Sequence, residues 1–243
     1  MPAIDPCSGG RVCDDAGCWV TLCGGTYERG SAAGDPDERP VRRVHVAPLQ
    51  VLEREATVGL WSACVAASGC REDPDWSVDA LCTRSDADLP ITCIDWFQAR
   101  DLCAFAGGRL PSEAEWEFAA RSGGRDLAYP WGDARPTCDR LVSDRKACGV
   151  RGLQPGCSRP AGNTSQGVCD LAGNAFEWCA DWHHGYGDAP TDGSAQGRPG
   201  RFRSMRGGGI GSDEAPRTRN RVFHPPEFSY PGLGVRCVRG VAP

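Results

Sequence analysis

The chain of 243 residues lacks several patterns that would define a function directly. No apolar run approaches the roughly 20 residues that a membrane-spanning helix needs, and no secretory signal segment is visible. The net charge is −5, so the basic surface that neutralises nucleic-acid phosphates is missing. The locally basic stretch 198–206 is interpreted as a solvated loop edge. We therefore expect no membrane span and no nucleic-acid partner.

The cysteines also lack a zinc signature, although they are abundant. The chain has 15 cysteines without a C-x-x-C pair, and no histidine lies beside the Cys13, Cys18, Cys23 series that comes nearest to zinc spacing. Disulfides in an oxidising compartment are the better interpretation, and they predict an extracytoplasmic protein that is periplasmic, exposed at the cell surface or secreted. The odd count leaves at least one cysteine without an intrachain partner.

The local disulfides expected first are Cys64–Cys70, Cys138–Cys148 and Cys157–Cys169. A bond between Cys93 and Cys103 is not expected if both lie on or beside one straight helix. Ten helical residues span about 15 Å, whereas the Cα atoms of a disulfide lie about 4.4–6.8 Å apart.

Glycine and proline number 32 and 19, which indicates much loop and turn. β-Branched residues in 41–52 predict extended structure, and N-caps with closing glycines predict helices over 57–69, 95–107 and 112–123. The glutamates of the last helix are interpreted as favourable charges near its N-terminus. Few helices followed by a long irregular segment predict an α+β domain dominated by loops.

Five motifs then occur in a fixed order, and together they are specific. They are GGRLPSEAEWEFAARSGG (107–124), YPWGD (129–133), GVCDLAGNAFEWCADW (167–182), RGGG (206–209) and GLGVRCVR (232–239). In this order the chain resembles the formylglycine-generating enzyme family, also called sulfatase-modifying-factor domains. The resemblance implies a disulfide-rich α+β fold, a variant of the C-type lectin fold with little regular secondary structure. It divides the chain into a cysteine-rich extension, 1–23, and a sulfatase-modifying-factor-like domain, 24–243.

The family's metal site appears in this sequence without its sulfur ligands. The name-giving enzyme oxidises a substrate cysteine to formylglycine with copper held by two cysteines that follow the glycine motif. The matching positions here are Ser212 and Arg217, in a stretch between Cys179 and Cys237 that has no cysteine. A hydroxyl is a poor ligand for Cu(I), and a guanidinium has no lone pair to give. The resemblance therefore implies the backbone frame of the site without copper.

The motif AGNAFEW at 172–178 resembles the family's calcium loop. Side-chain oxygens and carbonyls suit this hard cation, and the alternative is an asparagine turn beside a buried tryptophan. The implied ligands are Asn174, Glu177, Gly173 and Ala175, with Asp139 at a second site.

The segment 206–231 is the expected surface for a protein, peptide or small ligand. Its candidate binding residues are Asp213, Glu214, Arg217, Arg219, Arg221 and His224. Two functions stay open. One is an extracytoplasmic binding or accessory module without oxidase chemistry, and the other is a divergent oxidoreductase that acts on a protein or peptide. Counting free thiols and bound copper, iron and calcium would discriminate between them.

Overall fold

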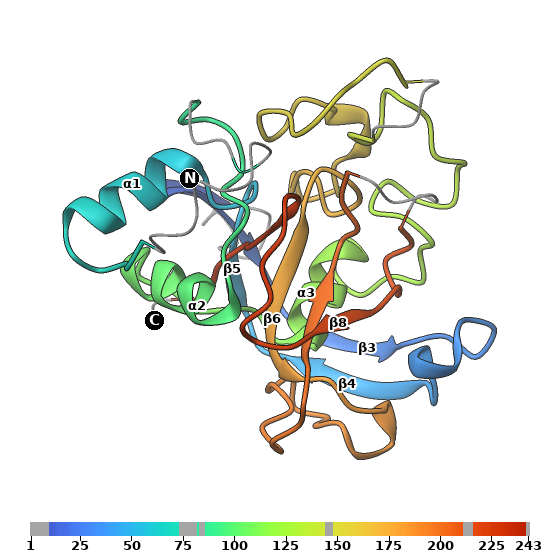
Figure 1. Ribbon diagram of the computed structural model, residues 1–243. Helices are drawn as coiled ribbons and strands as arrows, with labels where there is room; N and C mark the ends of the chain where they lie inside the picture. Colours follow the sequence, from blue (N-terminus) through green and yellow to red (C-terminus); the bar gives the residue numbers. More distant parts are fainter. Residues whose placement is uncertain (1–9, 73–81, 83–85, 144–147, 211–215, 242–243) are drawn as a thin grey trace, which may run out of the picture.

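The computed structural model describes residues 10–72, 82, 86–143, 148–210 and 216–241. Figure 1 shows short strands and helices joined by long loops. The strands are β1 (Arg11–Asp14), β2 (Gly17–Leu22), β3 (Gly25–Arg29), β4 (Arg42–Val46), β5 (Leu49–Leu52), β6 (Phe176–Trp182), β7 (Arg203–Arg206), β8 (Val222–His224), β9 (Leu233–Gly234) and β10 (Val238–Gly240). The helices are α1 (Val58–Ala66), α2 (Trp96–Phe105) and α3 (Glu113–Ala120), with short 3₁₀ helices η1 (Pro36–Glu38), η4 (Pro160–Gly162) and η5 (Tyr186–Asp188). The α+β class is confirmed.

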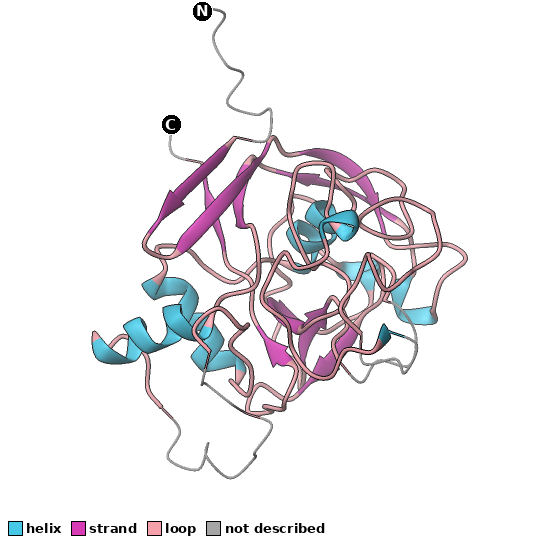
Figure 2. Ribbon diagram, turned by 90° about the horizontal axis from the view of Figure 1, so that it is seen from above, coloured by secondary structure: helices cyan, strands magenta, loops and turns pink. Residues whose placement is uncertain are grey.

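The strands within the described residues form two four-stranded sheets and one hairpin. The first sheet has the order β1-β2-β5-β10 and is antiparallel throughout. The second has the order β8-β7-β6-β9, in which only β6 and β9 run parallel, and β3 pairs with β4. Loops cover much of the surface between these sheets (Figure 2).

The first strands belong to the sheet rather than to a separate extension. β2 pairs with β5, with Val20 opposite Val51, and Trp19 is buried. A boundary before residue 24 would cut through this sheet. The apolar residues of β2 need the cover of β5 and the helices, which explains why this stretch joins the domain core.

All three helices begin where their capping residues predict. Thr57 accepts a hydrogen bond from the backbone of α1. Reciprocal capping boxes join Asp95 to Gln98 at the start of α2 and Ser112 to Glu115 at the start of α3. Caps satisfy backbone N–H groups that have no partner inside the helix, so these short helices start at defined residues.

Two apolar clusters make up the core. One includes Trp19, Trp61 and Trp178 and packs under α1 and α2, which lie side by side in Figure 1. The other includes Val44 and Phe118, on β4 and α3. Because α3 contacts β3, β4, β6 and β7, its polar side chains are carried into the interior together with its apolar ones.

Six disulfides join described residues, and all three expected local pairs are confirmed. The pairs are Cys13–Cys18, Cys64–Cys70, Cys82–Cys93, Cys103–Cys237, Cys138–Cys148 and Cys157–Cys169. Cys93, which lies before α2, and Cys103, which lies within it, take different partners, so the bond that was not expected is not formed. The fold is therefore disulfide-rich, and the Cys13–Cys18 bond removes two thiols from the series that came nearest to zinc spacing.

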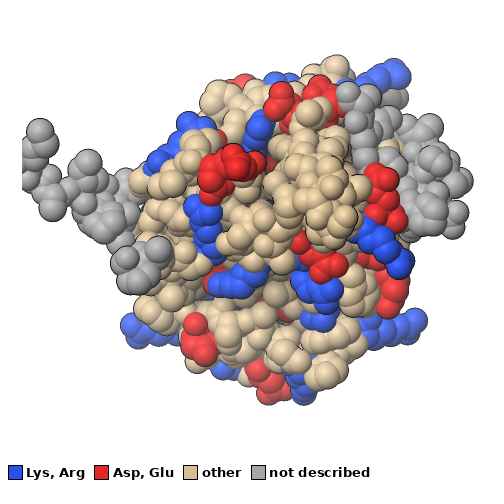
Figure 3. Space-filling model, turned by 90° about the vertical axis from the view of Figure 1, so that its left-hand side faces the viewer, with Lys and Arg blue, Asp and Glu red and all other residues tan. Residues whose placement is uncertain are grey.

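The surface carries both signs of charge. In Figure 3, basic and acidic side chains are interspersed over the face that is on the left in Figure 1. Among the described residues, none of the helices has the length and apolar character to cross a membrane.

Candidate functional site

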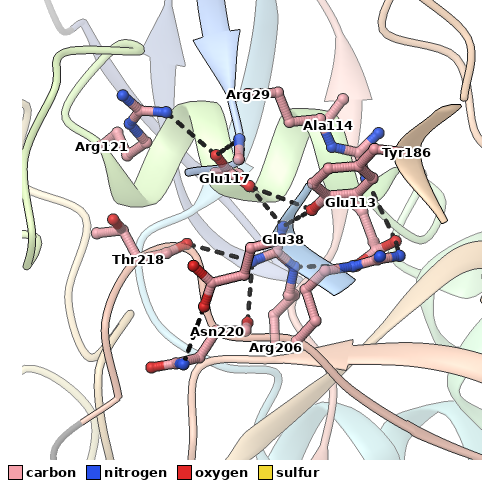
Figure 4. A network of polar contacts seen from close by, with 12 residues as sticks. Arg29, Glu38, Glu113, Ala114, Glu117, Arg121, Tyr186, Arg206, Thr218 and Asn220 are labelled. Atoms are coloured by element: carbon pink, nitrogen blue, oxygen red, sulfur yellow. Dashed lines mark hydrogen bonds and ion pairs between the residues drawn. The ribbon is translucent and has the colours of Figure 1, made fainter. Parts of the chain in front are cut away.

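A buried network of charged side chains joins α3 to β3, β7 and the residues before β8 (Figure 4). Glu113 and Glu117 stand one turn apart on α3, and at most 1% of either side chain is exposed. Residues four apart share one face of a helix, so both carboxylates point the same way. A buried carboxylate is costly unless it is paired, and arginines from three other parts of the chain supply the pairs.

Glu113 receives three guanidinium groups. Arg221 is bidentate, with Nε 3.0 Å from one carboxylate oxygen and Nη2 2.7 Å from the other. Arg206 Nε donates at 3.1 Å and Arg29 Nη2 at 3.3 Å. Burial alone would raise the pKa of Glu113, but Arg221, Arg206 and Arg29 lower it well below its ordinary value. The carboxylate is therefore held in its charged form.

Glu117 is satisfied in the same manner. Its Oε1 accepts from the Gly30 N–H at 2.8 Å and from Arg121 Nη1 at 3.1 Å, and its Oε2 accepts from Arg206 Nη2 at 2.7 Å. Burial opposes ionisation, but Arg206 and Arg29 outweigh it and lower the pKa of Glu117. Arg206 thereby joins the two glutamates of α3 to β7.

Tyr186 lies between two of these arginines. The guanidinium carbon of Arg29 is 4.0 Å from the centre of its ring, and that of Arg221 is 4.1 Å from it. Its hydroxyl accepts a hydrogen bond from Arg206 at 3.0 Å. Burial raises the pKa of Tyr186 to about 12, so the phenol stays neutral and the stacked cations keep an uncharged ring between them.

The three arginines expected to meet a ligand bind acidic groups of the protein itself. Arg217 Nη2 is 3.0 Å from Glu38 and 3.2 Å from Asp35, and Arg219 pairs with Asp126. Arg221 is buried against Glu113, so its expected place at a ligand surface is corrected: Glu113 requires it as a counter-charge in the interior. Ser212, Asp213 and Glu214 lie outside the described residues.

Aromatic side chains, rather than charges, mark the outer part of this segment. His224 stacks on Phe228 with ring centres 3.8 Å apart. The ring of Tyr230 is 5.9 Å from that of Phe228 and 6.3 Å from that of Phe176. Burial lowers the pKa of His224, so its ring is neutral near pH 7. On the other side of β8, Phe223 is 41% exposed. We call His224, Phe228, Tyr230 and Phe176 the aromatic ridge. Three of its four rings lie in VFHPPEFSY (222–230), whose ring spacing is a sequence signal that could have located it.

The side chains of the expected calcium loop have partners within the protein. Asn174 is buried, its amide donates to Glu55 Oε1 at 3.1 Å, and its oxygen accepts from the Gln154 N–H at 3.0 Å. Glu177 faces Arg236, with oxygen and nitrogen 2.7 Å apart, and accepts from Trp116. The carbonyls of Gly173 and Ala175 belong to the same turn, in which Asn174 has φ 60°. Calcium binding at this turn stays a prediction.

Asp139, the residue expected at a second calcium site, is exposed. A hydrogen bond from the Thr137 hydroxyl lowers the pKa of its carboxylate. This site also stays a prediction.

The fold and the site define a sulfatase-modifying-factor domain. Residues 11–241 match the model of the Sulfatase-modifying factor enzyme 1-like domain, and the chain belongs to this family. It is 32% identical over 170 residues to the inactive C-alpha-formylglycine-generating enzyme 2 of Bos taurus, covering 65% of this chain and 52% of the bovine protein. It is 28% identical over 283 residues to the formylglycine-generating enzyme of Streptomyces coelicolor, covering 90% and 88%. The chain thus spans about half of the bovine relative.

Among solved structures, PvdO from Pseudomonas aeruginosa matches with a TM-score of 0.80 and 26% identity, covering 96% of this chain and 98% of that one. The relatives include a protein named as inactive and one named as an enzyme, so similarity alone does not decide the activity of this chain.

The described residues do not fit the copper ion of the family's enzymes. Cys237 is bonded to Cys103, and Cys179 is buried in β6, where burial raises the pKa of its thiol well above the ordinary value. Within the part of the chain that the structure describes, one possible metal group occurs, and two of its three members are Cys157 and Cys169, which are bonded to each other.

Proposed function

We propose that this chain is an extracytoplasmic binding or accessory module of the sulfatase-modifying-factor family that does not oxidise cysteine. The observation that carries the proposal is Arg217. The family resemblance matches this position to a copper-binding cysteine, and the guanidinium contacts Glu38 and Asp35. A cation held by two acids can neither donate electrons to a metal nor leave its place without unpairing Glu38, which is fully buried.

The contacts around this position support a fixed frame rather than a catalytic loop. Thr218 is buried, and its hydroxyl donates to the carbonyl of Leu127 at 2.8 Å. Arg206 Nη1 donates to the carbonyls of Thr218 and Asn220 at 3.2 and 2.9 Å. These bonds hold residues 217–221 against α3, and the aromatic ridge beyond them offers apolar, planar surface to a protein, peptide or small ligand.

The disulfides support the proposed compartment. Six bonds between described residues suit an oxidising environment, because cytosolic reductants keep most thiols reduced.

The test is a titration of the purified chain with Cu(I) against a competing chelator, together with incubation of a cysteine-containing peptide under oxygen. We expect no stoichiometric copper and no aldehyde, measured by elemental analysis and by mass spectrometry of the peptide. One tightly bound Cu(I) per chain together with a peptide aldehyde would overturn the proposal.

A gain-of-function variant makes the negative result informative. The double substitution Ser212→Cys with Arg217→Cys restores two sulfur donors to the matching positions. We expect this variant to bind Cu(I) more tightly than the parent chain, whereas Cys179→Ser, which removes a buried thiol, leaves copper binding unchanged. Calcium is measured in the same samples, with Glu177→Gln as its control.

A further inference from the structure

A pocket lies outside the segment 206–231. It is a pocket of about 480 Å³ between α2, the start of α3, the loop 193–195 and the first residue of β7. Trp96, Leu110 and Ala180 provide apolar walls, and Arg203 lies among them. Its volume is within the range of pockets that enclose small ligands.

Arg203 is held in an unusual environment. Its guanidinium carbon is 3.8 Å from the ring centre of Trp96 and 3.6 Å from that of Trp182, so two indoles enclose the cation. Nη1 donates to the carbonyl of Ala180 at 2.7 Å, and the buried Nε has no hydrogen-bond partner. Among the described residues, no carboxylate forms an ion pair with this side chain. The two indoles fix its position, and the carboxylate of Asp181 stabilises its charge only through space.

The residues that line the pocket include more arginines than carboxylates, although Arg100 also pairs with Asp101 outside the lining. Arg100, Arg109 and Arg203 line it, and Glu115 is the one carboxylate among its lining residues. Arg109 binds Glu115 through both its Nη atoms at 2.7 and 2.6 Å, and just over half of its side chain is exposed. Burial lowers the pKa of Arg203 to about 10, and Arg100 acts in the same direction while Asp181 opposes both.

We propose that this pocket binds a small ligand that carries a carboxylate on an apolar body. The planar guanidinium of Arg203 matches the two oxygens of a carboxylate, and the indoles that enclose it hold the fork in place before the ligand arrives. Leu110, Ala180 and Ala195 offer the apolar body a surface to cover. The proposal rests on this pocket alone and not on the lack of oxidase activity.

The carboxylate has two sources that the experiment separates. Phenylacetate represents a free small acid, and N-acetylphenylalanine represents the carboxyl end of a peptide. N-acetylphenylalaninamide is the matched control, because it keeps the ring and the amide but loses the charge. Binding to the intact chain is measured by ligand-observed NMR and calorimetry at low and high salt.

We expect at least one acid to bind, the amide to bind about tenfold more weakly or not at all, and salt to weaken the acid. A preference for phenylacetate would indicate a free acid, and a preference for N-acetylphenylalanine would indicate a peptide terminus. Equal binding of the acid and its amide, or binding of neither acid, would overturn the proposal.

Variants locate the site. Arg203→Lys keeps the charge but loses the fork, and we expect about tenfold weaker acid binding, with the amide unchanged. Since Arg203 also packs against two indoles, a second variant is needed in case this one does not fold. Arg100→Ala changes a side chain that is about half exposed, and we expect about threefold weaker acid binding. Unchanged acid binding in the folded variants would contradict the assignment.

Discussion

Two arginines on one short strand show opposite ways of burying a cation. Arg206, at the end of β7, bonds to Glu113, Glu117 and two carbonyls, and its side chain is fully buried. Arg203, at the start of the same strand, has two indoles and one carbonyl as its contacts. Residues three apart point to opposite faces of a strand, which places these side chains in different surroundings.

The comparison distinguishes a charge that stabilises the fold, that of Arg206, from a charge that can bind a ligand, that of Arg203. Around α3, cations and carboxylates neutralise one another, so a ligand would have to break buried ion pairs to enter. Beside α2 the charge of Arg203 is stabilised by ring faces, which attract a cation without using its donors. The predictions below test this difference, from the largest expected effect to the smallest.

Glu113→Gln removes the carboxylate that Arg221, Arg206 and Arg29 share. We expect a loss of about 3–5 kcal/mol in the free energy of unfolding, because buried Arg221 and Arg29 lose their paired carboxylate and Arg206 loses one of its two. Denaturant titration measures it. Glu115→Gln is the control, since its partner Arg109 is largely exposed, and a loss below about 1 kcal/mol is expected. Equal losses in the two variants would show that the network does not depend on the charge of Glu113.

The same substitution at both arginines of β7 compares the two faces directly. Arg206→Lys cannot reach all the acceptors that the planar fork serves, and we expect a loss of about 2–4 kcal/mol. Arg203→Lys keeps a cation between the rings and should cost about 1 kcal/mol. Denaturant unfolding curves of the two variants, recorded under the same conditions, measure the two losses in the free energy of unfolding. A larger loss at Arg203 would reverse the comparison.

The stability that Asp181 contributes changes with pH in the opposite direction to the stability that Glu113 contributes. The oxygens of Asp181 accept from the backbone N–H groups of Glu113 and Gln196 at 2.8 and 3.0 Å. Burial and the charge of Glu113 raise its pKa from 3.8 to about 6. Its contribution to stability is therefore present below the unfolded value and is lost as the pH rises through about 6. The lowered pKa of Glu113 acts in the opposite direction, because its contribution is present above its unfolded value and is lost in acid.

We expect Asp181→Asn to remove a decline in stability of up to about 1.4 kcal/mol per pH unit between pH 4 and 6. Denaturant unfolding at steps across that range measures the slope. Parallel curves for the variant and the parent would contradict the raised pKa of Asp181.

Arg100→Ala is the smallest change. The side chains of Arg100 and its neighbour Asp101 are both about half exposed, so their ion pair should contribute less than about 0.5 kcal/mol to stability. The melting temperature of this variant should match that of the parent chain. A large shift would mean that the surface of the pocket is part of the packed core.

Local features of the fold were predictable, and distant pairings were not. The caps at Thr57, Asp95 and Ser112 and three of the five short-range disulfides between described residues were predicted, because these features depend on residues close together in sequence. Cys103–Cys237 has a sequence separation of 134, and no local pattern specifies it. The family motifs, whose order runs along most of the chain, identified the domain.

The site was harder to predict for the same reason. Glu113 and Glu117 look like ordinary charges in the first turns of a helix, because Arg221 and Arg206 lie 108 and 93 residues away from Glu113 in sequence. Arg221 was expected at the surface because charge predicts exposure when its partner is unknown. The enclosure of Arg203 needs α2, β6 and β7 together, and no single segment contains that information.

The bond between Cys103 and Cys237 links the end of α2 to the residue before β10 and closes a covalent ring over more than half of the chain. A protease that cuts once between these two residues therefore releases nothing. On a non-reducing gel the nicked molecule migrates as one species, and the fragments separate only after a reductant opens the ring.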